Sequence, residues 1–343
     1  MSEPVLSVRS LNRAVLARQG LLARAERGLA EALERMGGLQ AQYAPSMYIG
    51  LWSRLAGLER ATLTAALCDR SLVQGTLLRS TIHLVSRADY WPFAHATRAA
   101  RRRQWLRATD ATPQAMAAAA RAVRRALGEG TLSRAELEGL VGKPRANAVG
   151  AWIDLVRVPP AGTWERRRAD VFGAADVWLG DEPALDERAA AEHLVRRYLA
   201  AFGPASRKDV ATFTGLAPAV VRPLLARLEL RTFRSESGER LLDLRDQPLP
   251  DPETPASPRF LPTWDAALLV HARRALILPE EHRPKLFHVR LPQSLPSFLI
   301  DGQVAGTWRF QDGEVALAPF APLPDAAMAE LEAEAARLAS FHR

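Results

Sequence analysis

An internal repeat constrains the fold of this chain more than any other feature of its sequence. The segments TLSRAELEGLVGKPRANAVGAW, from Thr131, and PASRKDVATFTGLAPAVVRPLL, from Pro204, align with each other. A serine, an acidic residue three positions later and a glycine recur in both: Ser133, Glu136 and Gly142, then Ser206, Asp209 and Gly215. The serine and acidic residue predict a helix with a capping box, and the glycine predicts a turn into a second helix. We therefore expect two helix-turn-helix units.

Each copy is followed by residues typical of a β-hairpin wing. VRVPPAGTWERRRADVFG follows the first copy, and LRTFRSESGERLLDLR follows the second, with Ser237-Gly238 as its turn. The pattern predicts two winged helices in tandem. Pro223 falls inside the second helix of the second copy, where a proline is unfavourable.

The remaining segments predict an α+β fold that is mainly α. The first 125 residues or so are mostly helical, with a strand from Thr81 to Val85 that leads into a helix and a break near Pro113. RDQPLPDPETPASPRF is a proline-rich linker, and a β-rich part with a final helix from Pro324 to about Ala339 follows it. We divide the chain into residues 1–125, 126–188, 189–248 and 249–343.

The charge of the chain favours a nucleic-acid partner without proving one. There are 46 basic and 38 acidic residues, giving a net charge of +8. Only three of the basic residues are lysines, and a GC-rich genome alone would also enrich arginine and alanine. The single cysteine, and the lack of a signal peptide or a long apolar run, predict a cytoplasmic, nucleoid-associated protein with no membrane contact.

Motifs of metal, nucleotide and hydrolase sites are absent. The histidines have no HExxH or comparable spacing, and they stand at positions 83, 95, 193, 271, 282, 288 and 342. No phosphate-binding glycine loop and no GxSxG elbow occurs. Two carboxylates have local explanations, Asp265 as a helix cap and Asp301 in a hairpin turn with Gly302. We expect neither a metal nor a cofactor.

Arginines lie beside a tryptophan at two places. The segment TWERRRADVF lies on the first predicted wing, so we expect its tryptophan and arginines to contact DNA. These residues are Trp164, Arg166, Arg167 and Arg168. In RAARRRQWLR the arginines 101–103 lie beside Trp105 on a predicted helix, and there we favour a solvated helix face over a contact with DNA.

The segment GGLQAQYAPS holds two glutamines, Gln40 and Gln42, between a helix that ends at Gly37-Gly38 and one that can begin at Pro45. If this segment is extended, both side chains point to the same side. They are either a polar connection that satisfies backbone groups at the helix ends, or a pair of amides that holds one water molecule. The residues alone leave both interpretations open.

The order of several segments resembles a known family. LNRAVLARQGLL, GGLQAQYAPSMYIGLWSRL, RSTIHLV, RVPPAGTWERRRADVFG, LPTWDAALLVHARRALILPEEHRPKLF and FLIDGQVAGTWR together resemble the bacterial tandem winged-helix DNA glycosylases of the AlkZ type. The similarity runs from about Leu11 to Phe320. One branch of that family carries a glutamine–any–glutamine motif, which here falls on Gln40 and Gln42.

The resemblance implies three winged helices in a C-shaped arrangement with a basic concave surface, and a β-hairpin that enters the minor groove. It implies a monomer that acts on double-stranded DNA, excises N-alkylated purines and unhooks interstrand crosslinks, with water held by Gln40 and Gln42. The family's threonine–any–histidine–leucine segment falls on Thr81, His83 and Leu84, near the lesion, and Arg79 begins the same stretch. We expect Arg79, Thr81 and His83 to contact DNA. His83 is open to two interpretations, a strand histidine bonded to backbone or a contact to a phosphate.

The chemistry of the lesion fits two neutral amides. An alkylated purine is cationic and leaves as a neutral base, so positioning a water molecule can suffice for its hydrolysis. No lysine lies near the glutamine motif to form a Schiff base, so we predict a monofunctional DNA glycosylase, without lyase activity. The alternative is a non-catalytic winged-helix DNA-binding protein, either a transcription regulator or a sequestering resistance protein; an RNA-binding module lacks its usual motifs.

Overall fold

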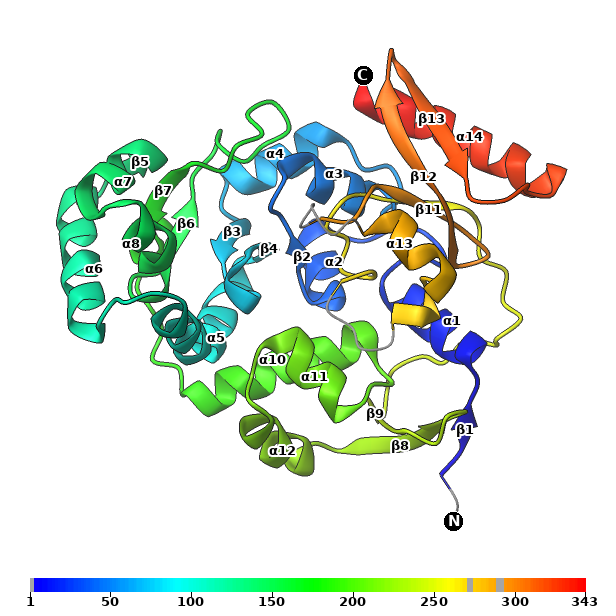
Figure 1. Ribbon diagram of the computed structural model, residues 1–343, viewed down its shortest axis with the longest axis horizontal. Coiled ribbons are helices and arrows are strands. Elements are labelled where there is room, and N and C mark those ends of the chain that lie inside the picture. Colours follow the sequence, from blue (N-terminus) through cyan, green and yellow to red (C-terminus); the bar gives the residue numbers. More distant parts are fainter. Residues whose placement is uncertain (1–2, 270–273, 288–292) are drawn as a thin grey trace.

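Three units of this protein share one order of elements: a helix, a strand, two helices and two strands, which is a winged helix. The computed structural model describes residues 3–269, 274–287 and 293–343. Figure 1 places the second unit at one end of the molecule, the first in the centre and the third below it. In the third unit an isolated bridge between Ala205 and Leu242 replaces the first strand.

The elements of the three units are as follows. The first has α2 (Leu29–Met36), β2 (Leu39–Gln40), α3 (Ala44–Trp52), α4 (Arg60–Cys68), β3 (Leu72–Thr76) and β4 (Ile82–Ser86). The second has α6 (Pro113–Leu127), β5 (Thr131–Ser133), α7 (Arg134–Val141), α8 (Lys143–Ala148), β6 (Leu155–Arg157) and β7 (Val171–Ala174). The third has α10 (Glu187–Phe202), α11 (Arg207–Thr214), α12 (Pro218–Arg227), β8 (Leu230–Ser235) and β9 (Arg240–Leu244).

Both predicted helix-turn-helix segments are confirmed, as α7–α8 and α11–α12. Ser133 and Ser206 each accept a bond from the backbone of the acidic residue three positions on, whose carboxylate bonds back, so both capping boxes are present. The second wing turns at Ser237-Gly238 as predicted, with Gly238 at a φ of 81°. Helix α12 continues through Pro223, and its buried side chains hold it against α10 and α11.

The first two units share a six-stranded sheet of order β2-β4-β3-β6-β7-β5. The seam is the antiparallel pair β3–β6, where Gln74 lies opposite Arg157. The sheet therefore connects the wing of the first unit to the wing of the second. A separate three-stranded sheet, in which β1 (Val5–Leu6) lies parallel to β8, belongs to the third unit.

Helices outside the units connect them. Helix α5 (Arg87–Ala108), the helix predicted after the strand, packs along α10, and its N-cap is Ser86 with Asp89 in the first turn. The other connecting elements are α1 (Val8–Arg18), α9 (Ala175–Leu179), η1 (Leu78–Ser80) and η2 (Val149–Ala151). The break at Pro113 is confirmed, because α5 ends before it and α6 begins there. Helix α6 crosses the predicted boundary at 125/126, and the division into four parts stays a prediction.

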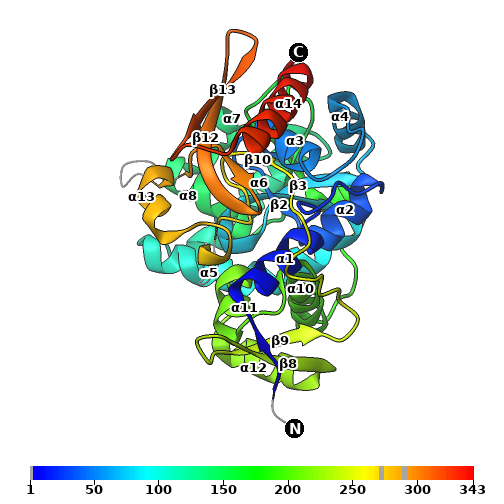
Figure 2. The same ribbon diagram turned by 90° about the vertical axis from the view of Figure 1, so that its right-hand side faces the viewer.

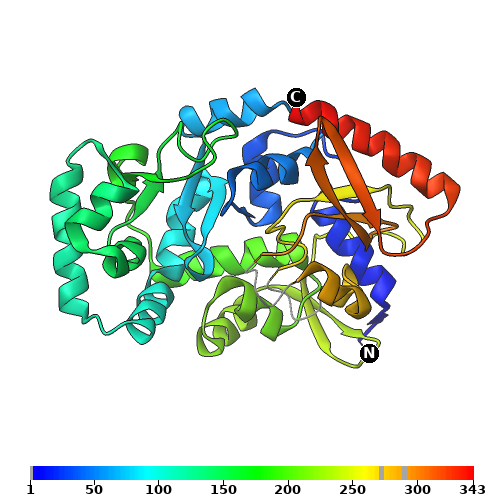
Figure 3. The same ribbon diagram turned by 45° about the horizontal axis from the view of Figure 1, so that its top comes forward.

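The C-terminal part is a four-stranded antiparallel sheet covered by a helix, as predicted. Its elements are β10 (Arg259–Leu261), η3 (Arg274–Leu276), η4 (Glu280–His282), α13 (Arg283–Leu286), β11 (Ser297–Ile300), β12 (Gln303–Gln311), β13 (Glu314–Pro319) and α14 (Asp325–His342). Figure 2 and Figure 3 show α14 lying beside β12 and β13. Phe260, Phe298 and Trp308 share one hydrophobic cluster with Tyr48 and Trp52 of α3, so this sheet and the first unit are held by a common core.

Two carboxylates were assigned local roles from the sequence. Asp301-Gly302 is the turn of the β11–β12 hairpin, as predicted. The assignment of Asp265 as a helix cap is wrong, because no helix begins there within the described residues. Asp265 instead forms a buried ion pair with Arg54 at the end of α3.

Two further findings concern only the part of the chain that the structure describes. None of its helices is long and apolar enough to cross a membrane. It also holds no group of three or more histidine, cysteine, aspartate or glutamate side chains that could bind a metal ion. His271 and His288 lie outside the described residues.

Candidate functional site

A pair of glycines shapes the approach to the glutamine motif. Helix α2 ends at Gly37, which has a φ of 71°, and Gly38 follows with a φ of 80°. A Cβ atom on Gly38 would lie 3.0 Å from Cγ1 of Val85 and 3.2 Å from the carbonyl oxygen of Leu84. The missing side chain therefore lets β2 reach β4 directly after the helix.

We expect Gly38→Ala to lower the free energy of unfolding by about 2 kcal/mol or more, since a left-handed residue with a Cβ costs about 1–2 kcal/mol before any contact is counted. Urea unfolding measures the loss. Gly57→Ala is the matched control, because Gly57 has a φ of 63° with nothing within 4 Å of its added Cβ. Equal losses in the two variants would contradict the close approach at Gly38.

The two glutamines lie along the edge of the six-stranded sheet. Gln40 is opposite His83 in the β2–β4 ladder and is 7 % exposed, and its side-chain amide has no hydrogen-bond partner among the described residues. Gln42 is exposed in the bend before α3, and its Oε1 accepts a bond of 2.8 Å from the backbone N–H of Ile82. Because only the amide oxygen can accept from that N–H, this bond fixes the orientation of the Gln42 amide. Both glutamines therefore border the start of β4.

His83 is buried at this edge and neutral. Its Nδ1 lies 3.1 Å from the carbonyl oxygen of Thr81, which requires that Nδ1 carry the proton and donate it. Burial, and next the positive charge of Arg79, lower the pKa of His83 to about 3. Its Nε2 is thus a hydrogen-bond acceptor at neutral pH.

The buried histidine predicts a pH dependence of stability. The folded pKa of about 3 lies below the ordinary value of 6.5, so between these values the unfolded chain binds a proton that the folded chain does not. Stability from this group is present above pH 6.5 and is lost as the pH falls toward 3. From pH 7 to pH 5 we expect a loss of about 2 kcal/mol in urea unfolding, absent from His83→Gln. Equal pH dependence in both proteins would contradict a neutral buried His83.

The loop between β6 and β7 brings the predicted basic wing to the glutamines. The side chain of Gln74 donates a 2.7 Å bond to the carbonyl oxygen of Gly162, which ties this loop to the first unit. Arg167 then donates a 3.1 Å bond to the hydroxyl of Tyr43, the residue after Gln42. Tyr43 is 41 % exposed and was missed from the sequence, although an aromatic residue next to the motif was a usable signal.

The other residues predicted on this wing differ in their surroundings. Arg166 is exposed and pairs with Asp170 at 3.3 Å, and Arg168 is exposed. Trp164 is 6 % exposed, and its ring packs edge-on against Tyr48 and Phe341. This burial argues against the predicted contact between Trp164 and DNA, because the ring fills the core beneath the loop.

Arg79 lies at the tip of the β3–β4 hairpin, on the approach to Thr81. Its backbone is left-handed, with a φ of 52°, and its guanidinium donates to the carbonyl oxygen of Phe213 at the end of α11. The structure thus gathers Gln40, Gln42, Thr81 and His83 around the start of β4. Arg79 faces the third unit, and Arg167 approaches through Tyr43.

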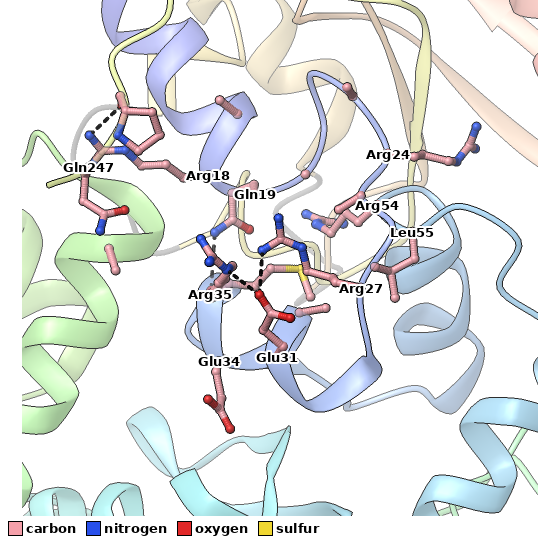
Figure 4. A pocket seen from close by; sticks show the side chains of 18 of the residues that line it. Arg18, Gln19, Arg24, Arg27, Glu31, Glu34, Arg35, Arg54, Leu55 and Gln247 are labelled. Atoms are coloured by element: carbon pink, nitrogen blue, oxygen red, sulfur yellow. Dashed lines mark hydrogen bonds and ion pairs between the residues drawn. The ribbon is translucent and has the colours of Figure 1, made fainter.

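A separate cavity of about 650 Å³ lies between α1, α2 and α10 (Figure 4). It is rich in arginines, but they are paired with carboxylates. Arg27 and Arg35 share Glu31 at 3.5 and 3.0 Å, and Arg197 pairs with Glu34 at 2.9 Å. The candidate residues of the sheet edge do not line this cavity.

Comparison with known proteins identifies the family. A sequence model of the family described as "DNA glycosylase AlkZ-like" matches residues 33–341, which is most of the chain. The chain belongs to the AlkZ-like DNA glycosylase family. A relative from Streptomyces sahachiroi, named "Interstrand DNA cross-link repair glycosylase", is 24% identical and aligns over 94% of this chain and 93% of its own. The solved structure of the Streptomyces sahachiroi DNA glycosylase AlkZ matches with a TM-score of 0.82 and 21% identity, covering 99% and 98% of the two chains.

Membership of the AlkZ-like family confirms three predictions made from the sequence. The fold class is confirmed, the protein is an enzyme of the DNA glycosylase class, and its substrate is DNA. The roles of Gln40, Gln42, Thr81, His83 and the arginines stay predictions.

Proposed function

We propose that this AlkZ-like glycosylase hydrolyses the N-glycosidic bond of purines alkylated at N7 or N3 in double-stranded DNA. One observation carries the proposal: the exposed Gln42 amide, held by the N–H of Ile82, lies beside the unpaired Gln40 and the neutral His83 on one sheet edge. These groups are uncharged, so they can orient a water molecule but are poor bases.

A substrate with a labile bond suits such a site. In an N7- or N3-alkylated purine the ring is cationic, and the electron pair of the breaking C1′–N bond neutralises it. The oxygen of water forms the new bond to C1′ and releases a proton to solvent, so the products are a neutral base and an abasic sugar. An unmodified purine would leave as an anion and needs an acid that two glutamines do not supply. Selectivity for the lesion would follow from this difference.

The geometry supports separate roles for the two amides. The oxygen of Gln42 has a second lone pair beside the one that Ile82 uses, so it can accept a hydrogen bond from water. The side-chain amide of Gln40, with no partner among the described residues, is free to bond the same water molecule. Holding that water near C1′ converts a bimolecular step into a pre-organised one, which is worth several kcal/mol.

We further propose that the enzyme is monofunctional. A lyase step on the abasic sugar needs an amine that forms a Schiff base. The three lysines of the chain, Lys143, Lys208 and Lys285, lie in α8, α11 and α13 rather than at the sheet edge. The product is then an intact strand with an abasic site.

The wider context extends the proposal to crosslinked DNA. The Streptomyces sahachiroi relative is named an interstrand cross-link repair glycosylase, and a crosslink through N7 has the same cationic leaving group at each end. Because duplex DNA is the substrate, we place the activity at the nucleoid in the cytoplasm, carried out by a monomer. Neither a metal nor a cofactor is required by this chemistry.

The experiment that tests the proposal uses a duplex with one N7-methylguanine and a second duplex with an N7–N7 crosslink. Alkali cleavage reveals abasic sites, and cleavage without alkali would reveal lyase activity. Alkali-dependent product from the methylated duplex, and separated strands from the crosslinked one, are the expected results. Tight binding with no abasic product on either duplex would refute the proposed activity on N7-alkylated purines.

A further inference from the structure

A second cavity, of about 620 Å³, lies between the first and third winged helices. Its walls are α5, the tip of the β3–β4 hairpin and the turn between α11 and α12. Four arginines line it: Arg79, Arg101, Arg103 and Arg107. No carboxylate is among its lining residues, in contrast to the cavity of Figure 4, where Glu31 and Glu34 neutralise their arginine neighbours. We call it the arginine cavity.

Arg79 lines this cavity and has no ion-pair partner among the described residues. It bonds the carbonyl oxygen of Phe213, and its guanidinium lies 5.3 Å from the centre of the Phe213 ring. Burial, which removes water from the guanidinium, lowers the pKa of Arg79 to about 10. A left-handed backbone at a residue other than glycine costs energy and persists only where the surroundings impose it. An anion bound in the cavity would replace the favourable interactions with water that the Arg79 guanidinium loses when it is buried.

Arg103 and Arg107 supply the exposed charges of the arginine cavity. They stand four residues apart on α5, so both side chains lie on one face of the helix. Both are exposed, and neither has an ion-pair partner among the residues that the structure describes. Arg101 is different, because it is buried and donates to the carbonyl oxygens of Thr76 and Gly150. Arg101 therefore braces α5, while Arg103 and Arg107 are available to a ligand.

One hydrogen bond and the β3–β4 hairpin itself connect the arginine cavity to the proposed catalytic edge. Ser80, next to Arg79, bonds the side chain of Gln104 on α5, which fixes the hairpin tip against the helix. Thr81 and His83 then follow on the same hairpin, close enough for the charge of Arg79 to act on His83. An anion bound in the cavity would lie next to the strand that carries the candidate residues.

We infer that the arginine cavity binds a phosphate of the DNA backbone beside the lesion. This inference rests on the proposed function only for the place of the lesion, since DNA is the substrate of the family. Arginine suits a phosphate because its planar fork of donors matches the phosphate oxygens. The third winged helix then meets DNA through the turn at Thr214, Gly215 and Ala217, and that turn is joined to the first unit by Arg79.

The salt dependence of DNA binding tests the inference. For each phosphate contact, the logarithm of the association constant falls with the logarithm of salt concentration with a slope of about −0.9. Affinity for an undamaged 20-base-pair duplex would be measured across a salt series by fluorescence anisotropy. We expect the double variant Arg103→Ala/Arg107→Ala to bind several-fold more weakly. The slope of its log association constant against log salt concentration should be smaller in magnitude by about one.

Two further proteins make the result decisive. Arg121→Ala/Arg125→Ala removes two exposed arginines with the same spacing from α6, neither of which has an ion pair among the described residues. It should keep the slope of the unaltered protein, and Arg103→Lys/Arg107→Lys should regain most of the lost slope. An unchanged slope in the α5 variant, or an equal loss in the α6 variant, would overturn the inference.

The binding assay separates this inference from the proposed function. Undamaged DNA requires no base excision. A slope change in a protein that forms no abasic sites on the alkylated duplexes would therefore support the phosphate site and refute the proposed excision of alkylated purines. In an active protein, the α5 variant should need more enzyme for half-maximal single-turnover rate but reach the same maximal rate. Loss of the maximal rate with unaltered binding would count against a phosphate contact.

Discussion

Replacing Gln42 with alanine should lower the maximal single-turnover rate of base excision on the order of 100-fold, which is the effect of misplacing a reacting group by about an ångström. Gln42 is exposed, and the N–H of Ile82 that it now satisfies can turn to water, so the variant should fold normally. Gln40→Ala should have a comparable effect, because one amide alone leaves the water free to rotate. The measurement is the rate of abasic-site formation on an N7-methylguanine duplex with enzyme in excess.

The controls for this prediction separate catalysis from binding. Gln114→Ala removes an exposed glutamine from α6 and should leave the rate unchanged. Affinity for the lesion duplex should be nearly the same in all variants, since a neutral amide contributes little to the electrostatic attraction of DNA. If both glutamine variants retain the full rate, the water is held elsewhere and the polar-connection interpretation of the motif stands.

The two helix-turn-helix units could be predicted because their signals are local. A serine and a carboxylate three residues apart start each first helix, and a glycine ends it. The first winged helix gave no such signal from its residues, and only the family resemblance implied it. All nine residues of α3 are buried, so no polar face reveals a helical period, and β2 has only two residues. The elements of the first winged helix depend on the sheet and the hydrophobic core that they join, and these long-range contacts leave no local pattern in the sequence.

Trp164 and Arg167 show why the site was only partly predictable. A tryptophan beside arginines has the same sequence pattern whether its ring faces a DNA groove or the protein core. The Trp164 ring faces the core, because it packs against Tyr48 and Phe341, which are distant in the sequence. Arg167 reaches Tyr43 only because the loop is docked on the first unit, again through a long-range contact. Residue types could be assigned from the motif, but their surroundings could not.

Asp265 was also misassigned because its partner, Arg54, is distant in the sequence. The buried ion pair between them predicts a large effect on stability. Each side chain is 1 % exposed, and the two carboxylate oxygens accept bonds of 2.8 and 2.9 Å from the guanidinium. The pair joins the segment after β10 to the end of α3. Removing one partner leaves a buried charge without compensation, whereas removing both does not.

Asp265→Ala should therefore lower the free energy of unfolding by about 3–5 kcal/mol in urea titrations, because Arg54 stays buried and charged. Asp181→Ala, at an exposed position with no ion pair among the described residues, should change it by less than about 0.5 kcal/mol. The double variant Arg54→Met/Asp265→Leu should recover most of the loss, since apolar side chains can replace a buried pair at little cost. A double variant as unstable as Asp265→Ala would show that the local bonds of the two side chains, which Asp265 accepts from the N–H of Ala267 and Arg54 donates to the carbonyl oxygen of Gly50, matter more for stability than the charge balance.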